Sequence, residues 1–254
     1  MEISKLTWKE IENLPKDTVF FISISPLEAH GPHLPVSTDL EISKRIEKAT
    51  IESVEKHGIK CVSLPSLNAG VCKHLQGFPG TLSLRWKIVY EMLLDIFYSF
   101  AEYGFKYFVI ISFHMDLFHL KALHKAIKKA RKRGIKACEP ISAYYFRKEL
   151  FERNDGEIHA DVNETSLALY LFPEMVGNYD IKDFKIKFNL INSLKNFREI
   201  GADDAYIGSP RNATAEYGEK LFNKIVEKCT QSTLFLREGK ITELPKKIKV
   251  LLGI

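Results

Sequence analysis

Short apolar runs alternate along the chain with longer segments in which apolar residues recur at the helical period. The runs at residues 19–25, 60–64, 107–112 and 135–142 predict strands, and the third is the richest in β-branched and aromatic side chains. The periodic segments predict helices at residues 40–57, 83–104, 121–136, 164–173 and 216–236. Because strands and helices alternate, we expect an α/β fold with a mainly parallel sheet flanked by helices.

Several helix ends carry local signals. Thr38 followed by Glu41 predicts a capping box, Gly58 predicts the end of the same helix, and Ser83 is expected to cap the next one. Residues 65–81 are expected to form a long loop, and residues 178–216 show no assignable pattern. Because no repeat or low-complexity linker divides the chain, we expect a single domain over residues 1–254.

Composition narrows the class of protein. With 45% hydrophobic and 27% charged residues, the 254-residue chain has an ordinary globular composition and no apolar run long enough to span a membrane. The N-terminus does not resemble a signal peptide, so we expect a cytoplasmic protein without a membrane partner. The same compartment suits four widely spaced cysteines, which are Cys61, Cys72, Cys138 and Cys229.

The net charge of +5 is concentrated in the basic segment 121–136. Such a helix could bind nucleic acid, but no aromatic residues for base stacking are interleaved with its charges. The favoured interpretation is a solvated helix face that buries Leu120, Leu123, Ile127 and Ala130. We therefore expect no nucleic-acid partner.

The segment 27–39 carries the densest potential chemistry. Glu28, His30, His33 and Asp39 follow an apolar strand directly, and oxygen and nitrogen ligands of this kind suit divalent metals. Glu28 and His30 point the same way if the backbone is extended, because side chains alternate along a strand. The segment predicts a metal site, with a polar structural loop as the alternative.

Further histidines fall in loops that follow other predicted strands. In parallel sheets these loops share one rim, where ligands collect. Besides the two histidines of segment 27–39, the loop residues are His74, His114 and His159. By contrast, His57, His119 and His124 fall on predicted helices and are expected to be surface or packing residues.

Three motifs together resemble the creatininase (creatinine amidohydrolase) family. They are the segment 28–39, the run Gly-Phe-Pro-Gly-Thr-Leu-Ser-Leu at 77–84, and Glu-Ile-His-Ala-Asp-Val-Asn-Glu-Thr-Ser at 157–166. The resemblance implies a three-layer α/β sandwich, homo-oligomers such as hexamers, and a pair of divalent ions that hydrolyses an amide bond. Zn, Mn and Fe are all compatible with such a ligand set.

By position, the resemblance also implies roles for single residues. It makes Glu28, His30 and His114 metal ligands, Asp39 the bridging carboxylate, and His159 the residue that handles protons. Two further carboxylates have open roles. Asp116 stands where creatininase has a metal-binding Glu, but it could equally cap the following helix, and Glu164 could serve the site or a helix start.

The chain departs from the family's pattern at three places. Residues 113–117 read Phe-His-Met-Asp-Leu instead of Gly-His-Gly-Gly-Asn, Asp161 replaces a Gly, and the only tryptophans are Trp8 and Trp86. These differences predict a reshaped pocket and make creatinine an unsuitable substrate.

Three side chains near the reshaped turn are candidate substrate contacts. They are His33, His74 and Met115, of which His33 could equally be a supporting loop residue and His74 a structural one.

The leading hypothesis is a metal-dependent amidohydrolase that cleaves C–N bonds other than peptide bonds, in a small cyclic amide or formamide-type molecule. One alternative is a formamidopyrimidine-nucleotide deformylase of flavin or deazaflavin biosynthesis. Another is a non-catalytic family member acting as a binding or assembly protein. Nucleophilic catalysis by Cys72 is disfavoured, because no Cys–His–Asn pattern accompanies it.

Overall fold

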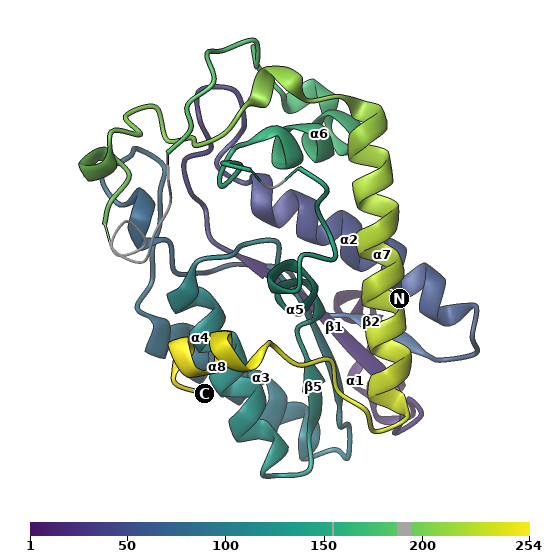
Figure 1. Cartoon of the computed structure of the whole chain (residues 1–254). Coiled ribbons are helices and arrows are strands. Elements are labelled where there is room, and N and C mark those ends of the chain that lie inside the picture. Colours follow the sequence, from purple (N-terminus) through teal and green to yellow (C-terminus); the bar gives the residue numbers. More distant parts are fainter. Residues whose placement is uncertain (154, 187–194) are drawn as a thin grey trace.

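A parallel β-sheet forms the centre of the computed structural model, which describes residues 1–153, 155–186 and 195–254 (Figure 1). Its strand order is β2-β1-β4-β5, and β3 also pairs with β1; every pairing is parallel. The bounds are β1 Val19–Ser25, β2 Cys61–Ser63, β3 Leu67–Asn68, β4 Tyr107–Ile111 and β5 Lys136–Cys138.

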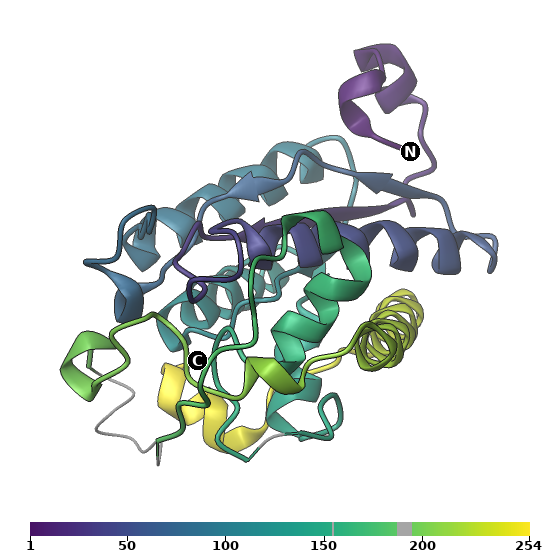
Figure 2. The same cartoon turned by 90° about the horizontal axis from the view of Figure 1, so that it is seen from above.

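Helices cover both faces of this sheet (Figures 1 and 2). Those packed with the face of Val19 and Phe21 are α2 Thr38–Glu55, α5 Pro140–Phe146, α6 Val162–Leu171 and α7 Ala215–Arg237. Those packed with the face of Phe20 and Ile22 are α3 Trp86–Ala101, α4 Leu117–Arg131 and α8 Lys246–Leu252. The predicted three-layer α/β architecture is confirmed.

Shorter helical segments complete the described chain. They are α1 Trp8–Glu12 and the 3₁₀ turns Ile3–Lys5, Lys73–Leu75, Pro173–Met175, Arg198–Ile200 and Pro210–Asn212. No helix in the described residues is both long and apolar enough to cross a membrane. All four cysteines are buried and unpaired.

The predicted elements agree best where burial is complete. The strand at 19–25 and the closing helix match within one residue, and the basic helix buries the four apolar residues expected of it. The strand predicted at 135–142 was wrong beyond Cys138, because Pro140 opens α5 and Glu139 accepts the Ser142 N–H as its cap. The predicted loop at 65–81 also contains β3 and a 3₁₀ turn.

Both predicted N-caps were wrong. Ser37 occupies the N-cap of α2, and the Thr38 hydroxyl instead donates to the Pro35 carbonyl at 2.6 Å. Arg85 is the N-cap of α3, while the Ser83 hydroxyl accepts the Cys72 N–H at 3.0 Å. In both cases the hydroxyl stabilises the incoming loop rather than the helix end.

Strand order places the functional rim. β1 lies beside β4 although β2 and β3 intervene in sequence, so the chain changes direction across the sheet between these two strands. Loops that leave the carboxyl ends of such neighbours diverge and open a crevice. Here those loops carry Glu28 after β1 and His114 after β4.

Helices α6 and α7 pack with almost no space between them. A Cβ at Gly218 of α7 would lie 1.9 Å from the Ser166 carbonyl oxygen of α6, which is far inside van der Waals contact. The two helices must therefore separate to admit any side chain at this position.

We predict that Gly218→Ala destabilises the protein by about 2 kcal/mol, although alanine is the better helix former. The free energy of unfolding in urea measures the effect. Glu227→Ala, on an exposed position of the same helix, is the control and should change stability by less than about 0.5 kcal/mol. An unchanged or raised stability for Gly218→Ala would contradict the close packing.

Candidate metal centre

The loop after β1 folds back on itself and brings Glu28, His30 and Asp39 together. Glu28 N–H donates to the Val36 carbonyl at 2.9 Å, which returns the chain to the first turn of α2, where Asp39 lies. Gly31 turns the loop with φ +62°, and a Cβ there would meet the His33 ring at 2.8 Å. The loop therefore requires glycine at its tip.

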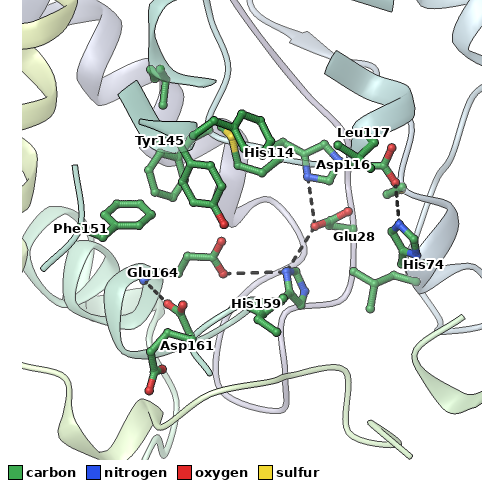
Figure 3. Close-up of a pocket in the computed structure, with 18 of the residues that line it drawn as sticks. Glu28, His74, His114, Asp116, Leu117, Tyr145, Phe151, His159, Asp161 and Glu164 are labelled. Carbon is green, nitrogen blue, oxygen red and sulfur yellow. Dashed lines mark hydrogen bonds and ion pairs between the residues drawn. The ribbon is translucent and has the colours of Figure 1, made fainter. Parts of the chain in front are cut away.

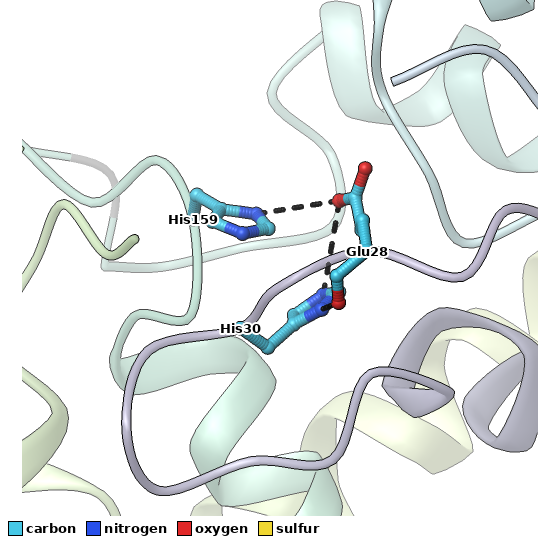
Figure 4. A group of neighbouring side chains, drawn as sticks. All are labelled: Glu28, His30 and His159. Atoms are coloured by element: carbon cyan, nitrogen blue, oxygen red, sulfur yellow. Dashed lines mark hydrogen bonds and ion pairs between the residues drawn. The ribbon is translucent and has the colours of Figure 1, made fainter. Parts of the chain in front are cut away.

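His114 enters the same space from the loop after β4, and His159 and Glu164 enter from the start of α6 (Figures 3 and 4). Asp39 lies between two imidazoles: its Oδ1 is 3.2 Å from His30 Nε2 and its Oδ2 is 3.0 Å from His114 Nδ1. The two carboxylate oxygens of Asp39 thus face different partners.

The other two carboxylates extend this arrangement in opposite directions. Glu28 Oε1 lies 3.3 Å from His114 Nδ1 and 3.7 Å from His159 Nδ1. Glu164 Oε2 lies 3.9 Å from both His30 Nε2 and His159 Nδ1. Apart from Glu164, whose side chain is 16% exposed, all of these groups are buried.

Backbone carbonyls hold all three imidazoles in one orientation. His30 Nδ1 donates to Glu28 O at 2.9 Å, His114 Nε2 to Val71 O at 2.8 Å, and His159 Nε2 to Ala29 O at 2.8 Å. Since a carbonyl only accepts, the other nitrogen of each neutral ring is a lone pair that faces the carboxylates. Lone pairs therefore face lone pairs, an arrangement that only a proton or a cation stabilises.

Electrostatics in the cluster follow from burial and proximity. Burial by itself would lower the pKa of His30, but Asp39, Glu164 and Glu28 outweigh it and raise that pKa to about 10. The pKa of His114 is likewise raised by Glu28 and Asp39 against the effect of burial. Burial raises the pKa of Glu28 and of Glu164. The cluster thus attracts positive charge.

The residues fit a pair of cations. One group of potential ligands is Glu28, Asp39 and His114, and another is His30, Asp39 and Glu164; within each, the ligand atoms lie within 4.8 Å of one another. Asp39 belongs to both groups. A third group joins Glu28, His30 and His159. Glu28 Oε2 is buried without a hydrogen-bond partner among the described residues, as expected of an oxygen meant for a metal.

Asp116 lies outside these three groups. Its Oδ1 accepts the N–H groups of Phe118 and His119 at 2.7 and 3.0 Å, so it is the N-cap of α4. Its Oδ2 faces His74 Nε2 at 3.6 Å. Asp116 therefore caps α4, although its Oδ2, like Glu28 Oε2, is buried without a hydrogen-bond partner among the described residues, whereas Glu164 belongs to one of the groups of potential ligands.

The candidate substrate contacts differ in position. His74 and Met115 line a cavity of about 440 Å³ in front of the cluster, together with Glu28, His114 and His159. The lining of the cavity does not include His33. That ring is buried behind the loop, where its Nε2 lies 2.9 Å from the Thr165 hydroxyl, so its position is that of a support for the loop.

The turn into α6 is held by its own polar groups. Ala160 adopts a left-handed conformation with φ +46°, and its N–H donates to Glu164 Oε2. Asp161 is the N-cap of α6 and accepts the Asn163 and Glu164 N–H groups. This turn fixes His159 and Glu164 relative to each other.

His119, expected only to pack on a helix, is a supporting residue of the cluster. It is fully buried; its Nδ1 accepts the Val71 N–H at 3.3 Å, and its Nε2 lies 3.0 Å from the Ser112 hydroxyl. The Val71 carbonyl in turn orients His114. The sequence gives little sign of this role beyond the three-residue spacing of Asp116 and His119, because the contact runs through the backbone of Val71 and any residue there has the same backbone groups.

Comparison with known proteins agrees with this geometry. The family model Creatininase, described as creatinine amidohydrolase, matches residues 4–233. The mycofactocin precursor peptide peptidase of Mycobacterium ulcerans (strain Agy99) is 26% identical over 220 residues, covering 82% of this chain and 81% of that protein. The creatinine amidohydrolase of Pseudomonas putida is 26% identical over 195 residues, covering 68% of this chain and 73% of that protein.

Solved structures share the fold. A crystal structure of creatinine amidohydrolase (creatininase) has a TM-score of 0.71 at 22% identity and covers 93% of this chain and 97% of its own. Related creatininase structures include a Mn form, with a TM-score of 0.69, and a Zn–Zn type of a mutant creatininase, with a TM-score of 0.70, both at 21% identity. The Mn form and the Zn–Zn type each cover 93% of this chain, and cover 98% and 97% of their own chains.

The buried His33 imidazole gives a prediction for acid stability. Burial, and the charge of His30, lower the pKa of His33 from 6.5 to about 4. Between these pH values the unfolded chain binds a proton that the folded chain does not, so stability falls as pH decreases through this window. We expect His33→Gln to lose less stability than the wild type between pH 6.5 and pH 4.

Urea unfolding of metal-free samples at both pH values measures the difference. His57→Gln, which removes an exposed imidazole just beyond the C-terminal end of α2, should keep the wild-type acid loss. An equal acid loss in His33→Gln and the wild type would show that His33 is protonated alike in the folded and unfolded chains.

Proposed function

Because the chain belongs to the creatininase family, we propose that it is an amidohydrolase that uses two divalent cations to cleave the C–N bond of a small cyclic amide or formamide-type molecule. The observation that carries the proposal is the convergence of three carboxylates on three imidazoles whose free lone pairs face them. Burying these acceptors so close together is costly in free energy unless positive charge lies between them.

In this proposal Glu28, Asp39 and His114 hold one cation, and His30, Asp39 and Glu164 hold the other. Asp39 would serve both cations, because its two oxygens face different imidazoles. The carbonyls of Glu28 and Val71 fix the tautomers of His30 and His114 for ligation, as outer partners of metal-binding imidazoles usually do.

A cation pair bound there supplies a nucleophile from water at neutral pH and polarises the amide carbonyl. His159 has the position for moving the proton. Burial lowers its pKa to about 3, so its Nδ1 is an unprotonated lone pair 3.7 Å from Glu28 Oε1, where it can accept a proton for transfer to the departing nitrogen. The Ala29 carbonyl holds the ring in place for this transfer.

The size of the cavity favours a small amide as the substrate. Its volume of about 440 Å³ lies toward the lower end of ligand pockets, and Glu28, His114, His159 and Glu164 of the cluster line it. A peptide substrate is the second candidate, because the mycofactocin precursor peptide peptidase is similar over 82% of this chain. The non-catalytic alternative is disfavoured, because three carboxylates and three imidazoles still converge on one point.

We predict that Glu164→Gln lowers the metal content of the protein and that Asp116→Asn does not. Glu164→Gln removes a charged ligand and should reduce the content from two ions per chain to about one. Asp116→Asn keeps a side-chain oxygen for the α4 cap and should retain both ions.

Elemental analysis of protein purified without chelators measures these contents, and Glu219→Gln on α7 controls for the loss of one carboxylate. Loss of an ion in Asp116→Asn, with both retained in Glu164→Gln, would assign the ligand role to Asp116 instead.

The proposed reaction predicts a separation of binding from turnover. With Zn, Mn or Fe restored, the wild type should hydrolyse at least one member of a panel of cyclic amides and formamides, and a chelator should abolish the activity. His159→Gln should keep both ions and lose about 100-fold or more in kcat. The function is wrong if fully metal-loaded protein turns over no amide, or if activity survives complete removal of metal.

A further inference from the structure

The cavity in front of the metal cluster has two unlike halves (Figure 3). One side carries His74 and Asp116, and the other carries the rings of Tyr145 and Phe151 beside Glu164. The cluster residue Glu28 lies between these sides, so a bound amide has the aromatic rings on one flank.

The aromatic side is built by two segments. Phe113 comes from the loop after β4, and Tyr145 and Phe151 come from α5 and the turn that follows it. The Phe151 centroid lies 6.2 Å from that of Phe113 and 5.6 Å from that of Tyr145, with interplanar angles of 64° and 78°. These are edge-to-face contacts, one of the arrangements that aromatic rings prefer, and a further aromatic ring could join them in the same way.

Aliphatic side chains extend this wall. Met115, Leu117 and Ile141 line the same cavity. Tyr145 and Phe151 pack against the core on one side, are only partly buried, and also line the cavity. Contact with a flat apolar ligand would remove this surface from water, which is favourable.

The charged side chains in the lining of the cavity disfavour anionic ligands. Five carboxylate side chains line the cavity, whereas no Lys or Arg among the described residues does so. The five are Glu28, Asp116, Glu157, Asp161 and Glu164. Lys185 pairs with Glu157 at 2.7 Å but does not line the cavity. The proposed cations would neutralise Glu28 and Glu164, but a phosphate or carboxylate elsewhere on the ligand would find no Lys or Arg partner among the described residues of the lining.

We propose that the substrate is an uncharged or cationic amide that carries an aromatic ring, with the ring against Phe113, Tyr145 and Phe151 and the amide at the metal cluster. The proposal rests on the proposed function, because the cluster fixes where the amide lies. It argues against a phosphorylated nucleotide as substrate.

Three hydroxamates test the proposal on metal-loaded protein by isothermal titration calorimetry. Acetohydroxamate reports the metals alone, benzohydroxamate adds the ring, and 4-carboxybenzohydroxamate adds an anion. In the wild type, benzohydroxamate should bind at least tenfold more tightly than acetohydroxamate, and the carboxylated compound at least tenfold more weakly than benzohydroxamate.

Matched variants assign the effect to the wall. Tyr145→Phe keeps the ring and should keep the preference, whereas Tyr145→Leu should reduce it severalfold and change acetohydroxamate affinity by less than twofold. Phe151→Leu provides the same comparison at the neighbouring ring if Tyr145→Leu does not fold.

The outcomes separate the two claims. If acetohydroxamate binds but the ring adds nothing, or if both leucine variants keep the full preference, the aromatic subsite is overturned and the metal centre stands. If benzohydroxamate binds equally well to metal-loaded and metal-free protein and depends on Tyr145, the subsite stands and the metal centre fails. If neither binds, both fail. Equal or tighter binding of the carboxylated compound overturns the exclusion of anions.

Discussion

Buried lone pairs that face one another are the constraint on which the rest of the site depends. Glu28, Asp39 and Glu164 point their oxygens at imidazole nitrogens whose other nitrogens already donate to backbone carbonyls. Burying such acceptors together is costly unless positive charge joins them. The fold meets this demand by bringing the loops after β1 and β4 to one point and by returning the first loop to α2.

The parts of this site that could be predicted from the sequence are those in which local pattern and burial agree. The apolar run of β1 leads directly into Glu28 and His30, and alternation along extended backbone places both on one side. His114 follows the next buried strand. These residues meet because parallel strands share a rim, a rule that needs no knowledge of side-chain packing.

Other features depend on interactions that the sequence pattern does not record. Asp116 has the same chemistry as a ligand and as a cap, and only the direction of α4 decides that its Oδ1 meets two N–H groups. His33 resembles its neighbours in the loop, yet the turn at Gly31 directs it behind the loop. The carbonyl of Val71, which orients His114, carries no sequence signal at all.

The departures from the family's pattern appear in the cavity. The turn at residues 113–117, glycine-rich in the family, here adds apolar side chains to the wall, while Glu164 joins the cluster from α6. The described site therefore combines carboxylates and imidazoles that could hold metal ions with a partly apolar lining. Specificity would then be set by residues that do not touch the metals.

Anomalous diffraction from crystals grown with zinc tests whether Asp39 joins two bound cations. We expect two peaks roughly 3.5–4 Å apart, one beside Glu28 and His114 and the other beside His30 and Glu164, with an oxygen of Asp39 next to each. A single peak, two peaks that do not share Asp39, or no peak in crystals grown with excess zinc would contradict a bridged pair of cations.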